Sequence, residues 1–370
     1  MHIVADENIP GLESLLPAGA TLERVHGRGL KTSAIARADA LLVRSVTQVN
    51  AALLADTPVQ FVGSATSGFD HVDRNYLERA GVAFAFAPGA NANAVVEYVL
   101  SAIAVVDDYL ARLLDGGRVG IVGYGHIGHA LARRLRLLGI ACAVYDPWLP
   151  EEGRRDAASL DDVLRCDVVT CHAELTTREP YSSLHLFDAD VLSALGSQQL
   201  LINASRGPVV DNKALLARCG AADAPTVVLD VWEGEPAIDA GLLEAVAIGT
   251  PHIAGYSIEG KLRGSAMLVE ALGAWFGVEC GQSRGAGDRV LSAPSGDLSA
   301  VISANYAIAQ DDADLRTAMH QTDPAQAFDR LRREYSERRE LLGAIVRVPS
   351  VTSEQRDLLA ALGLSVELNP

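Results

Sequence analysis

The sequence lacks a hydrophobic run long enough to cross a membrane. No stretch reaches the roughly 18–20 consecutive apolar residues that a bilayer-spanning helix needs. The first residues, Met1–Asp6, carry no basic segment followed by an apolar stretch, so we expect no secretory signal peptide. These absences argue against a membrane protein, and we expect a cytoplasmic one.

Positive charge is also scarce. Lys and Arg together number 31 against 47 Asp and Glu, which gives a formal net charge of −16. Nucleic acids and anionic membranes are bound by basic surfaces, so neither is an expected partner. An anionic substrate would need a local pocket of cations, because the overall field of the protein repels it.

Cysteine is sparse, and no two cysteines have the CxxC spacing of a metal or redox site. The five cysteines lie mostly in apolar surroundings, where cysteine usually serves as a small core residue. An alternative interpretation makes Cys171 and His172 a nucleophile and its base, or two metal ligands. Adjacent residues of a strand point to opposite faces, so this alternative is disfavoured and we expect no metal.

The chain contains two series of short β-like segments that alternate with helical stretches. The first series consists of Ile3–Ala5, Ala40–Val43, Gln60–Gly63 and Val82–Ala87. The second consists of Arg118–Val122, Ala141–Tyr145, Asp167–Cys171, Leu200–Asn203 and Val227–Val231. Strands separated by helices predict right-handed crossovers and parallel sheets. The predicted fold is therefore α/β, with two Rossmann-like or flavodoxin-like parallel-sheet domains.

The remaining segments connect and extend these two domains. Apolar residues of Asn91–Leu114 recur at helical spacing and predict one long connecting helix. A Gly- and Ser-containing stretch, Gly281–Gly296, is followed by a segment with helical periodicity and a basic patch around Arg330–Arg339. An extended run, Ala344–Val351, then precedes a short helix and a strand-like end. This pattern predicts a third, small α+β domain. The predicted domains are 1–90 with 256–280, 91–255, and 281–370.

A GxGxxG motif follows the strand Arg118–Val122 and opens an apolar helix. Gly123 permits the tight turn, Gly125 lets the backbone approach a pyrophosphate, and Gly128 permits close packing of helix on strand. The helix N-terminus offers free N–H groups to the phosphates. Asp146 ends the next strand, where its carboxylate accepts from ribose hydroxyls and repels a 2′-phosphate. The motif therefore predicts NAD binding, against the alternative of a structural turn followed by a chance aspartate.

Three further β-like segments end in polar groups. Arg206 follows the first, Glu235 the second and His252 the third. Ligands of open α/β sheets bind at the carboxyl ends of the strands, so we expect these groups to meet near the nicotinamide. Taken singly, they are equally compatible with a surface cation, a turn carboxylate before proline and a buried histidine. Their joint placement favours a catalytic set.

These motifs resemble the D-2-hydroxyacid dehydrogenase family. The resemblance covers residues 1–275 and rests on Gly123–Gly128, Asn203–Gly207, Asp230–Pro236 and Pro251–Gly255. It implies oxidation of a 2-hydroxy acid, in which His252 takes the hydroxyl proton while hydride passes to NAD. Glu235 would hold the imidazole in one tautomer, as the aspartate of a serine-protease triad does. Arg206 would bind the substrate carboxylate and the developing 2-oxo oxygen through its planar fork of donors.

Further segments resemble those family members that oxidise a phosphorylated acid. The segments are Val4–Pro10, Leu42–Thr47, Asp230–Pro236 and Pro251–Gly264. By this resemblance Ser45, Thr66 and Tyr256 contact the substrate, a small phosphorylated 2-hydroxy acid. The cations Arg44, Lys261 and Arg263 are candidates for binding its phosphate. In these enzymes the C-terminal domain forms a homodimer, which we expect of residues 281–370.

The resemblance also implies which residues contact NAD. They are Gly123, Gly125, His126, Ile127, Gly128, Asp146, Ala204, Ser205, Asp230 and Gly255. One departure concerns the segment after the strand Asp167–Cys171, where the family usually has His-Thr-Pro and this chain has His172-Ala173-Glu174. A hydroxyl contact to the cofactor is therefore lost at Ala173.

Two alternatives remain open at this point. The same catalytic residues occur in phosphoglycerate dehydrogenases and other D-2-hydroxyacid dehydrogenases, so the substrate is not settled by them. Non-catalytic proteins that sense NAD(H) share the fold but carry a flexible polar tail. The C-terminus here has the apolar periodicity of a packed domain, which favours an enzyme.

Overall fold

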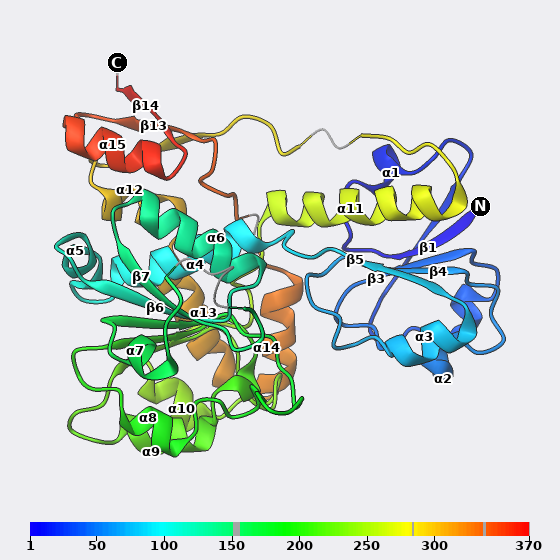
Figure 1. The fold of residues 1–370 in the computed structure, drawn as a ribbon. Helices are drawn as coiled ribbons and strands as arrows, with labels where there is room; N and C mark the ends of the chain where they lie inside the picture. The colour runs from blue at the N-terminus through cyan, green and yellow to red at the C-terminus, as the bar shows by residue number, and fades with distance from the viewer. Residues whose placement is uncertain (151–155, 283–284, 336–337, 370) are drawn as a thin grey trace. The chain divides into compact units, whose positions relative to one another are not determined.

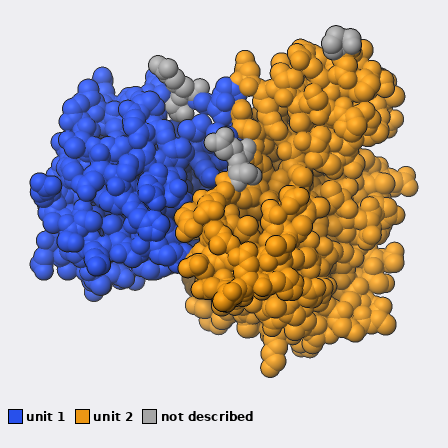
Figure 2. Space-filling model, turned by 180° about the vertical axis from the view of Figure 1, so that it is seen from behind, with its two compact units in different colours: residues 1–91, 257–287 blue, residues 92–256, 288–370 orange. Residues whose placement is uncertain are grey.

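The computed structural model describes residues 1–150, 156–282, 285–335 and 338–369, which form two compact units. Unit 1 consists of residues 1–91 and 257–287, and unit 2 of residues 92–256 and 288–370 (Figure 2). The predicted Gly- and Ser-containing stretch and the predicted basic patch each include two residues outside the described ranges. No helix in the described ranges is both long and apolar enough to span a membrane.

Unit 1 is built on a five-stranded parallel sheet with the strand order β2-β1-β3-β4-β5 (Figure 1). Its strands are β1 (His2–Asp6), β2 (Thr21–Val25), β3 (Ala40–Val43), β4 (Phe61–Ser64) and β5 (Ala83–Phe86). Its helices are α1 (Leu12–Leu15), η1 (Thr32–Ile35), α2 (Ala51–Leu54), α3 (Arg74–Ala80) and α11 (Ile258–Phe276).

Both faces of this sheet are buried. Leu42 and Phe61 pack with Leu268 of α11 in one apolar cluster, whereas their neighbours Leu41 and Val62 belong to a second cluster. Successive strand residues point to opposite faces, so the continuous apolar runs of β3 and β4 fit a sheet covered on both sides.

The sequence predicts four of these five strands and misses β2. This strand lies at the edge of the sheet and pairs with β1 alone. Its sequence, Thr-Leu-Glu-Arg-Val, includes Glu23 and Arg24, and none of its residues is fully buried. An edge strand with charged residues gives little hydrophobic signal, because much of its surface faces solvent.

Unit 2 contains a six-stranded parallel sheet with the order β11-β10-β9-β8-β6-β7. Its strands are β6 (Arg118–Val122), β7 (Ala141–Tyr145), β8 (Val168–Cys171), β9 (Leu200–Asn203), β10 (Thr226–Leu229) and β11 (Ile248–Gly249). The helices between them are α6 (His126–Leu137), α7 (Leu160–Leu164), α8 (Ala189–Ser193), η3 (Gly207–Val209), α9 (Asn212–Cys219) and α10 (Ala240–Ala245). The strand order reverses between β6 and β8, and ligands of such sheets bind at this switch point.

The predicted single helix over Asn91–Leu114 is wrong. The structure has two helices there, α4 (Ala92–Val105) and α5 (Tyr109–Leu114). Asp107, between them, has a φ of 45°, in the left-handed region that interrupts a right-handed helix. Aspartate enters this region more readily than most residues, so the Asp107-Asp108 pair explains the break.

The C-terminal part of unit 2 contains a third sheet of parallel strands, in the order β12-β13-β14. Its strands are β12 (Val290–Ser292), β13 (Ile345–Val348) and β14 (Ser365–Leu368), and its helices are α12 (Leu298–Asn305), α13 (Ile308–Met319), α14 (Pro324–Arg333) and α15 (Ser353–Ala361). The α/β fold class, with two parallel-sheet domains and a small C-terminal sheet, is confirmed.

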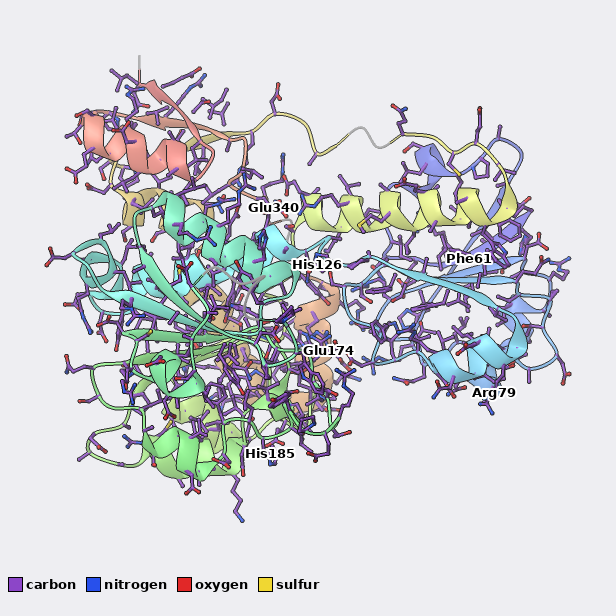
Figure 3. All side chains as sticks on the ribbon, viewed as in Figure 1. Phe61, Arg79, His126, Glu174, His185 and Glu340 are labelled. Atoms are coloured by element: carbon purple, nitrogen blue, oxygen red, sulfur yellow. The ribbon has the colours of Figure 1, made fainter. Side chains whose placement is uncertain are left out.

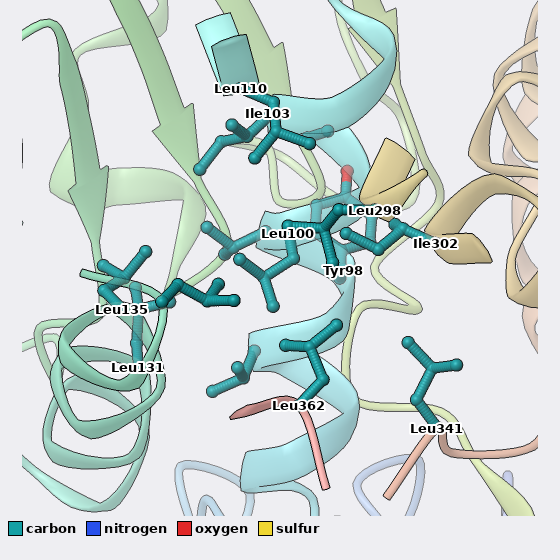
Figure 4. Packing of buried hydrophobic residues seen from close by; sticks show 14 of the residues in the cluster. Tyr98, Leu100, Ile103, Leu110, Leu131, Leu135, Leu298, Ile302, Leu341 and Leu362 are labelled. Carbon is teal, nitrogen blue, oxygen red and sulfur yellow. The ribbon is translucent and has the colours of Figure 1, made fainter. Parts of the chain in front are cut away.

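This C-terminal segment shares its core with the six-stranded domain. Figure 4 shows part of one cluster to which α4, α5, α6, α12 and the segments before β13 and after α15 contribute. Its labelled members are Tyr98, Leu100, Ile103, Leu110, Leu131, Leu135, Leu298, Ile302, Leu341 and Leu362. Leu315 of α13 and Phe328 of α14 are fully buried in another cluster, together with Trp232 and Leu242. The role of residues 281–370 as a dimerisation domain stays a prediction.

Candidate active site

The loop after β6 contains glycines at positions where a side chain would not fit. Gly123 has a φ of 92°, and a Cβ there would lie 2.6 Å from the backbone nitrogen of Ala173. A Cβ on Gly128 would overlap the carbonyl oxygen of Gly123, so α6 can pack this closely only with glycine. The Cβ position of Gly125 has no described protein atom within 4 Å. Glycine there leaves open space beside the loop for a ligand.

Helix α6 begins directly after Gly125 with His126, which is labelled in Figure 3. Both residues are exposed. Ile127 is partly buried and packs against the core behind the loop. The free N–H groups and the positive dipole end of the helix therefore face outward, where they favour the phosphates of a dinucleotide. The open space at Gly125 and this helix N-terminus fit the pyrophosphate of NAD.

Asp146, directly after β7, braces the same loop. Its Oδ2 accepts a hydrogen bond from the Tyr124 backbone N–H at 2.8 Å, and its Oδ1 accepts from the Trp148 N–H at 3.1 Å. The carboxylate is half-buried. The structure therefore brings the predicted ribose-binding carboxylate and the glycine loop together.

His252 and Glu235 form a hydrogen-bonded pair beyond β10 and β11. Nδ1 of His252 lies 2.8 Å from Oε2 of Glu235, and Oε1 of Glu235 accepts from the Trp232 N–H at 2.8 Å. Burial acts to raise the pKa of Glu235, but the charge and hydrogen bond of His252, together with the charge of Arg332, outweigh it and lower that pKa. The carboxylate is therefore charged and fixes one orientation of the imidazole.

Asp230 holds the backbone that carries His252. It is 1% exposed, and its carboxylate accepts from the Thr250 hydroxyl at 2.7 Å and from the N–H groups of Ile253 and Ala254 at 2.8 and 2.9 Å. Burial raises its pKa. His252 itself has a φ of 57°, uncommon for a residue with a side chain. Such a conformation persists only where the surroundings enforce it, as these hydrogen bonds do.

The loop after β9 presents Arg206. Asn203 organises this loop, because its Oδ1 accepts from the Ser205 N–H at 3.1 Å and from the Ser205 hydroxyl at 2.8 Å. Its Nδ2 donates to the carbonyl oxygen of Arg206 at 3.1 Å, and Nη1 of Arg206 donates to the Ser205 carbonyl oxygen at 2.9 Å. Ala204 and Ser205 are buried, whereas Arg206 is half-exposed. The guanidinium can therefore receive a ligand.

The loops of Arg206 and Glu235 lie directly against each other. A Cβ on Gly207 would overlap the carbonyl oxygen of Trp232, so the close approach requires glycine. Because β9, β10 and β11 are neighbours in the sheet, the residues that follow them meet at one edge. The structure therefore brings Arg206, Glu235 and His252 to the same carboxyl edge, with Ala204, Ser205, Asp230 and Gly255 in the same loops.

The predicted substrate contacts are divided between the two units. Ser45 and Thr66 follow β3 and β4 of unit 1, which are adjacent strands, so both lie at one edge of that sheet. Ser45 is exposed, and the Thr66 hydroxyl lies 2.7 Å from that of Ser64 and donates to the Gly68 carbonyl oxygen. Tyr256 belongs to unit 2, where its ring lies 5.8 Å from that of Tyr335.

The candidate phosphate-binding cations of unit 1 have partners of their own. Nη1 of Arg44 lies 3.9 Å from Oδ1 of the buried Asp6, and Nε of Arg263 donates to the Ala90 carbonyl oxygen at 2.9 Å. Lys261 lies on the same helix, α11, as Arg263. Arg44 thus offsets a buried charge, whatever else it binds.

Cys171 and His172 show no sign of a reactive pair. Both are buried, and burial raises the pKa of the Cys171 thiol and lowers that of His172 to about 3. No group of three or more His, Cys, Asp or Glu able to hold a metal occurs in the described ranges. The structure gives these two residues the environment of a core.

Sequence reasoning misses three side chains that shape the site. Thr250 donates to Asp230, Tyr98 lies 2.7 Å from Thr250, and Arg332 of α14 interacts with Glu235. Thr250 carries a usable signal, because it is a polar residue directly after the strand Ile248–Gly249. Tyr98 and Arg332 carry none, since each comes from a helix distant in sequence.

Comparison with known proteins identifies the domain that carries this geometry. Residues 99–254 match the model of the D-isomer specific 2-hydroxyacid dehydrogenase NAD-binding domain. Residues 291–363 match a domain of unknown function, DUF3410. A D-lactate dehydrogenase of Aquifex aeolicus, solved with NAD and lactic acid, has a similar fold, with a TM-score of 0.61 at 22% identity over 75% of this chain and 96% of that one. NAD-bound 3-phosphoglycerate dehydrogenase of Entamoeba histolytica gives a TM-score of 0.63 at 19% identity, over 75% of this chain and 95% of that one.

Two relatives are similar to this chain over its whole length. The erythronate-4-phosphate dehydrogenases of Marinobacter nauticus and Salmonella paratyphi A are each 42% identical to it, and each alignment covers 100% of both chains. The match therefore includes the C-terminal segment as well as the two parallel-sheet domains. The chain belongs to the erythronate-4-phosphate dehydrogenase family and is an NAD-dependent 2-hydroxyacid dehydrogenase.

Proposed function

We propose that the protein oxidises 4-phospho-D-erythronate at C2 to 3-hydroxy-2-oxo-4-phosphooxybutanoate, a step in the biosynthesis of pyridoxal 5′-phosphate. One observation carries the chemistry: the Glu235–His252 pair and Arg206 share the carboxyl edge of a dinucleotide-binding sheet. The substrate follows from the name of relatives that are 42% identical over their whole length.

His252 acts as the general base. Its Nδ1 is hydrogen-bonded to the Glu235 carboxylate, which requires the proton on Nδ1 and leaves Nε2 as an acceptor. Nε2 takes the proton of the C2 hydroxyl, and Glu235 stabilises the imidazolium that results. The imidazole side chain is 33% exposed and the carboxylate only 17%, so the base is accessible while its partner is shielded.

Arg206 orients the substrate. Its half-exposed guanidinium binds the C1 carboxylate and stabilises the negative charge that develops on the C2 oxygen. Bound NAD supplies the acceptor for the hydride that leaves C2. Ala204, Ser205, Asp230 and Gly255 would hold the nicotinamide part of NAD, and the glycine loop with His126, Ile127 and Asp146 would hold the rest of the dinucleotide.

The test is a panel of 2-hydroxy acids assayed by NADH absorbance. We expect 4-phosphoerythronate to give the highest kcat/KM, above 3-phosphoglycerate, D-lactate and unphosphorylated erythronate. Preference for 3-phosphoglycerate would assign the chain another substrate within the same chemistry. A protein that binds NAD but turns over no member of the panel would be a sensor of the nucleotide.

We also propose that the protein is a cytoplasmic homodimer assembled through residues 281–370. All five cysteines are free thiols, as expected in a reducing compartment. The C-terminal sheet and the turn before β13 offer an interface, because Val290, Leu342 and Leu368 are each about half exposed, at 48%, 49% and 56%. Leu342→Asp combined with Leu368→Asp should convert the dimer to monomer in sedimentation experiments. A double variant that sediments as a dimer would place the interface elsewhere.

A further inference from the structure

Helix α14 brings a cation from the C-terminal segment to the catalytic loops. Phe328, one turn before Arg332 on this helix, is fully buried in the same cluster as Trp232, which precedes Glu235. Just beyond the helix, the Tyr335 ring packs edge-on against that of Tyr256, 5.8 Å away. Arg332 lies between these two anchors, so its position beside the catalytic loops is fixed on both sides.

The surroundings of Arg332 are unusual for an arginine. Its Nε is buried and has no hydrogen-bond partner among the described residues. Its guanidinium shares a hydrogen bond with the Tyr256 side chain and interacts with the charges of Glu235 and Asp230. Burial acts to lower the pKa of Arg332, but these interactions outweigh it and raise that pKa. The guanidinium is therefore charged and incompletely satisfied.

An unsatisfied buried donor is costly unless a ligand completes it. No described carboxylate lies within ion-pair distance of Arg332, so the protein does not neutralise this charge by direct contact. The chain as a whole carries a net charge of −16, and a dianionic phosphate is repelled by it. A cation of this kind is what such a substrate requires.

We propose that Arg332, with the Tyr256 hydroxyl, binds the phosphate of the substrate and so makes the C-terminal segment part of the specificity site. The proposal rests on the proposed function, in which Arg206 takes the carboxylate next to C2. The phosphate is carried on C4, two carbons beyond C2. Its cation must therefore lie near His252, and Arg332, whose charge acts on the Glu235 carboxylate beside His252, meets that requirement.

The test compares two substrates in matched variants, with NAD saturating. Arg332→Gln should raise KM for 4-phosphoerythronate by about 10- to 100-fold, because it removes a charge-assisted contact to the phosphate. The kcat/KM for unphosphorylated erythronate should fall by a clearly smaller factor, because only the effect of the Arg332 charge on Glu235 is lost there. Arg332→Lys keeps the charge without the planar fork and should fall between wild type and Arg332→Gln. Arg333→Gln, on the same helix but exposed and paired with Glu334, serves as the control and should behave as wild type.

A second measurement does not depend on turnover. Calorimetric titration of the protein–NAD complex with inorganic phosphate should detect binding to wild type and to Arg333→Gln, and none to Arg332→Gln. Unaltered melting temperatures would show that the variants are folded. Equal losses on both substrates, or unchanged phosphate binding in Arg332→Gln, would overturn the proposal. If wild type failed to oxidise 4-phosphoerythronate but lost phosphate binding on Arg332→Gln, the proposed function would fail and the anion site would stand.

Discussion

The Nδ1 atom of His252 lies 2.8 Å from Oε2 of Glu235, and the other oxygen of that carboxylate accepts the Trp232 backbone N–H. Both oxygens of Glu235 are thus engaged, one by the chain and one by the imidazole. The hydrogen bond to Glu235 orients the ring of His252. The hydrogen bonds that Asp230 accepts from the backbone directly after His252 fix its main chain. Preorganisation of this kind lowers the cost of reaching the reactive geometry.

His252→Ala should remove the proton acceptor and leave the nucleotide site intact. Loss of a general base typically costs roughly 10²- to 10⁴-fold in rate, so kcat should fall by that amount. The affinity for NAD, measured by fluorescence or calorimetry, should change little, because the glycine loop and Asp146 are untouched. Turnover at a near-normal rate would mean that another residue accepts the proton.

Glu235→Gln should keep the imidazole oriented while removing the negative charge beside it. The imidazolium that forms during oxidation then loses its counter-ion, so kcat should fall by about 10- to 100-fold, as for the loss of a charge-assisted hydrogen bond. Steady-state kinetics of the variant and wild type test this. An unchanged kcat would remove Glu235 from its assigned role.

Asp146→Asn should weaken the discrimination against NADP. The wild-type carboxylate repels a 2′-phosphate, and we expect at least about tenfold weaker binding of NADP than of NAD, or roughly 1.4 kcal/mol. The asparagine keeps an oxygen for the Tyr124 N–H, which Asp146 binds in the structure. The glycine loop should therefore stay in place while the charge is lost, although the Trp148 N–H loses its acceptor. Equal affinities of wild type for both cofactors would contradict the assignment.

Glu97→Gln should change how stability depends on pH. Glu97, on α4, is 2% exposed and accepts the Leu341 N–H at 2.7 Å. Burial, together with the nearby Glu340, raises its pKa from 4.5 to about 7. Because the folded state binds this proton more tightly, the stability that it contributes is complete below pH 4.5 and is lost as the pH rises through 7.

Such a shift corresponds to about 3 kcal/mol of unfolding free energy between the two ends of this pH range. Urea unfolding at pH 5 and pH 8 should show a smaller decrease for Glu97→Gln than for wild type, because the amide does not titrate. An identical pH dependence in both proteins would show that Glu97 is ionised in the folded state.

The sequence predicts most of the two large sheets, because their strands are apolar and separated by helical stretches. Arg118–Val122, Ala141–Tyr145 and Leu200–Asn203 have the predicted bounds. Two predictions fail for different reasons. The edge strand β2 is charged and gives little hydrophobic signal, and the break between α4 and α5 comes from a left-handed conformation at Asp107 that periodicity does not detect. The packing of α13 and α14 depends on an apolar cluster that joins Leu315 and Phe328 to Trp232, far apart along the chain. No local pattern encodes such a contact.

Some residues of the candidate site can be predicted from the sequence, and others cannot. Residues that follow strands, such as Arg206 and His252, can be predicted because a parallel sheet brings its carboxyl ends to one edge. Arg332 comes from a helix beyond the sheet, and its neighbours on α14 are ordinary exposed arginines such as Arg333. Only the three-dimensional arrangement separates the two, since Nε of Arg332 is buried.

The apolar cluster that joins Tyr98 and Leu131 to Ile302 and Leu362 has a consequence for how the chain comes apart. A segment that shares its core with a nucleotide domain does not detach from it without exposing that core. A ligand that binds the folded state at the glycine loop therefore also stabilises the C-terminal strands, by a free energy that grows with the logarithm of ligand concentration. The resistance of the C-terminal segment to proteolysis should therefore increase with the fraction of the protein that has NAD bound.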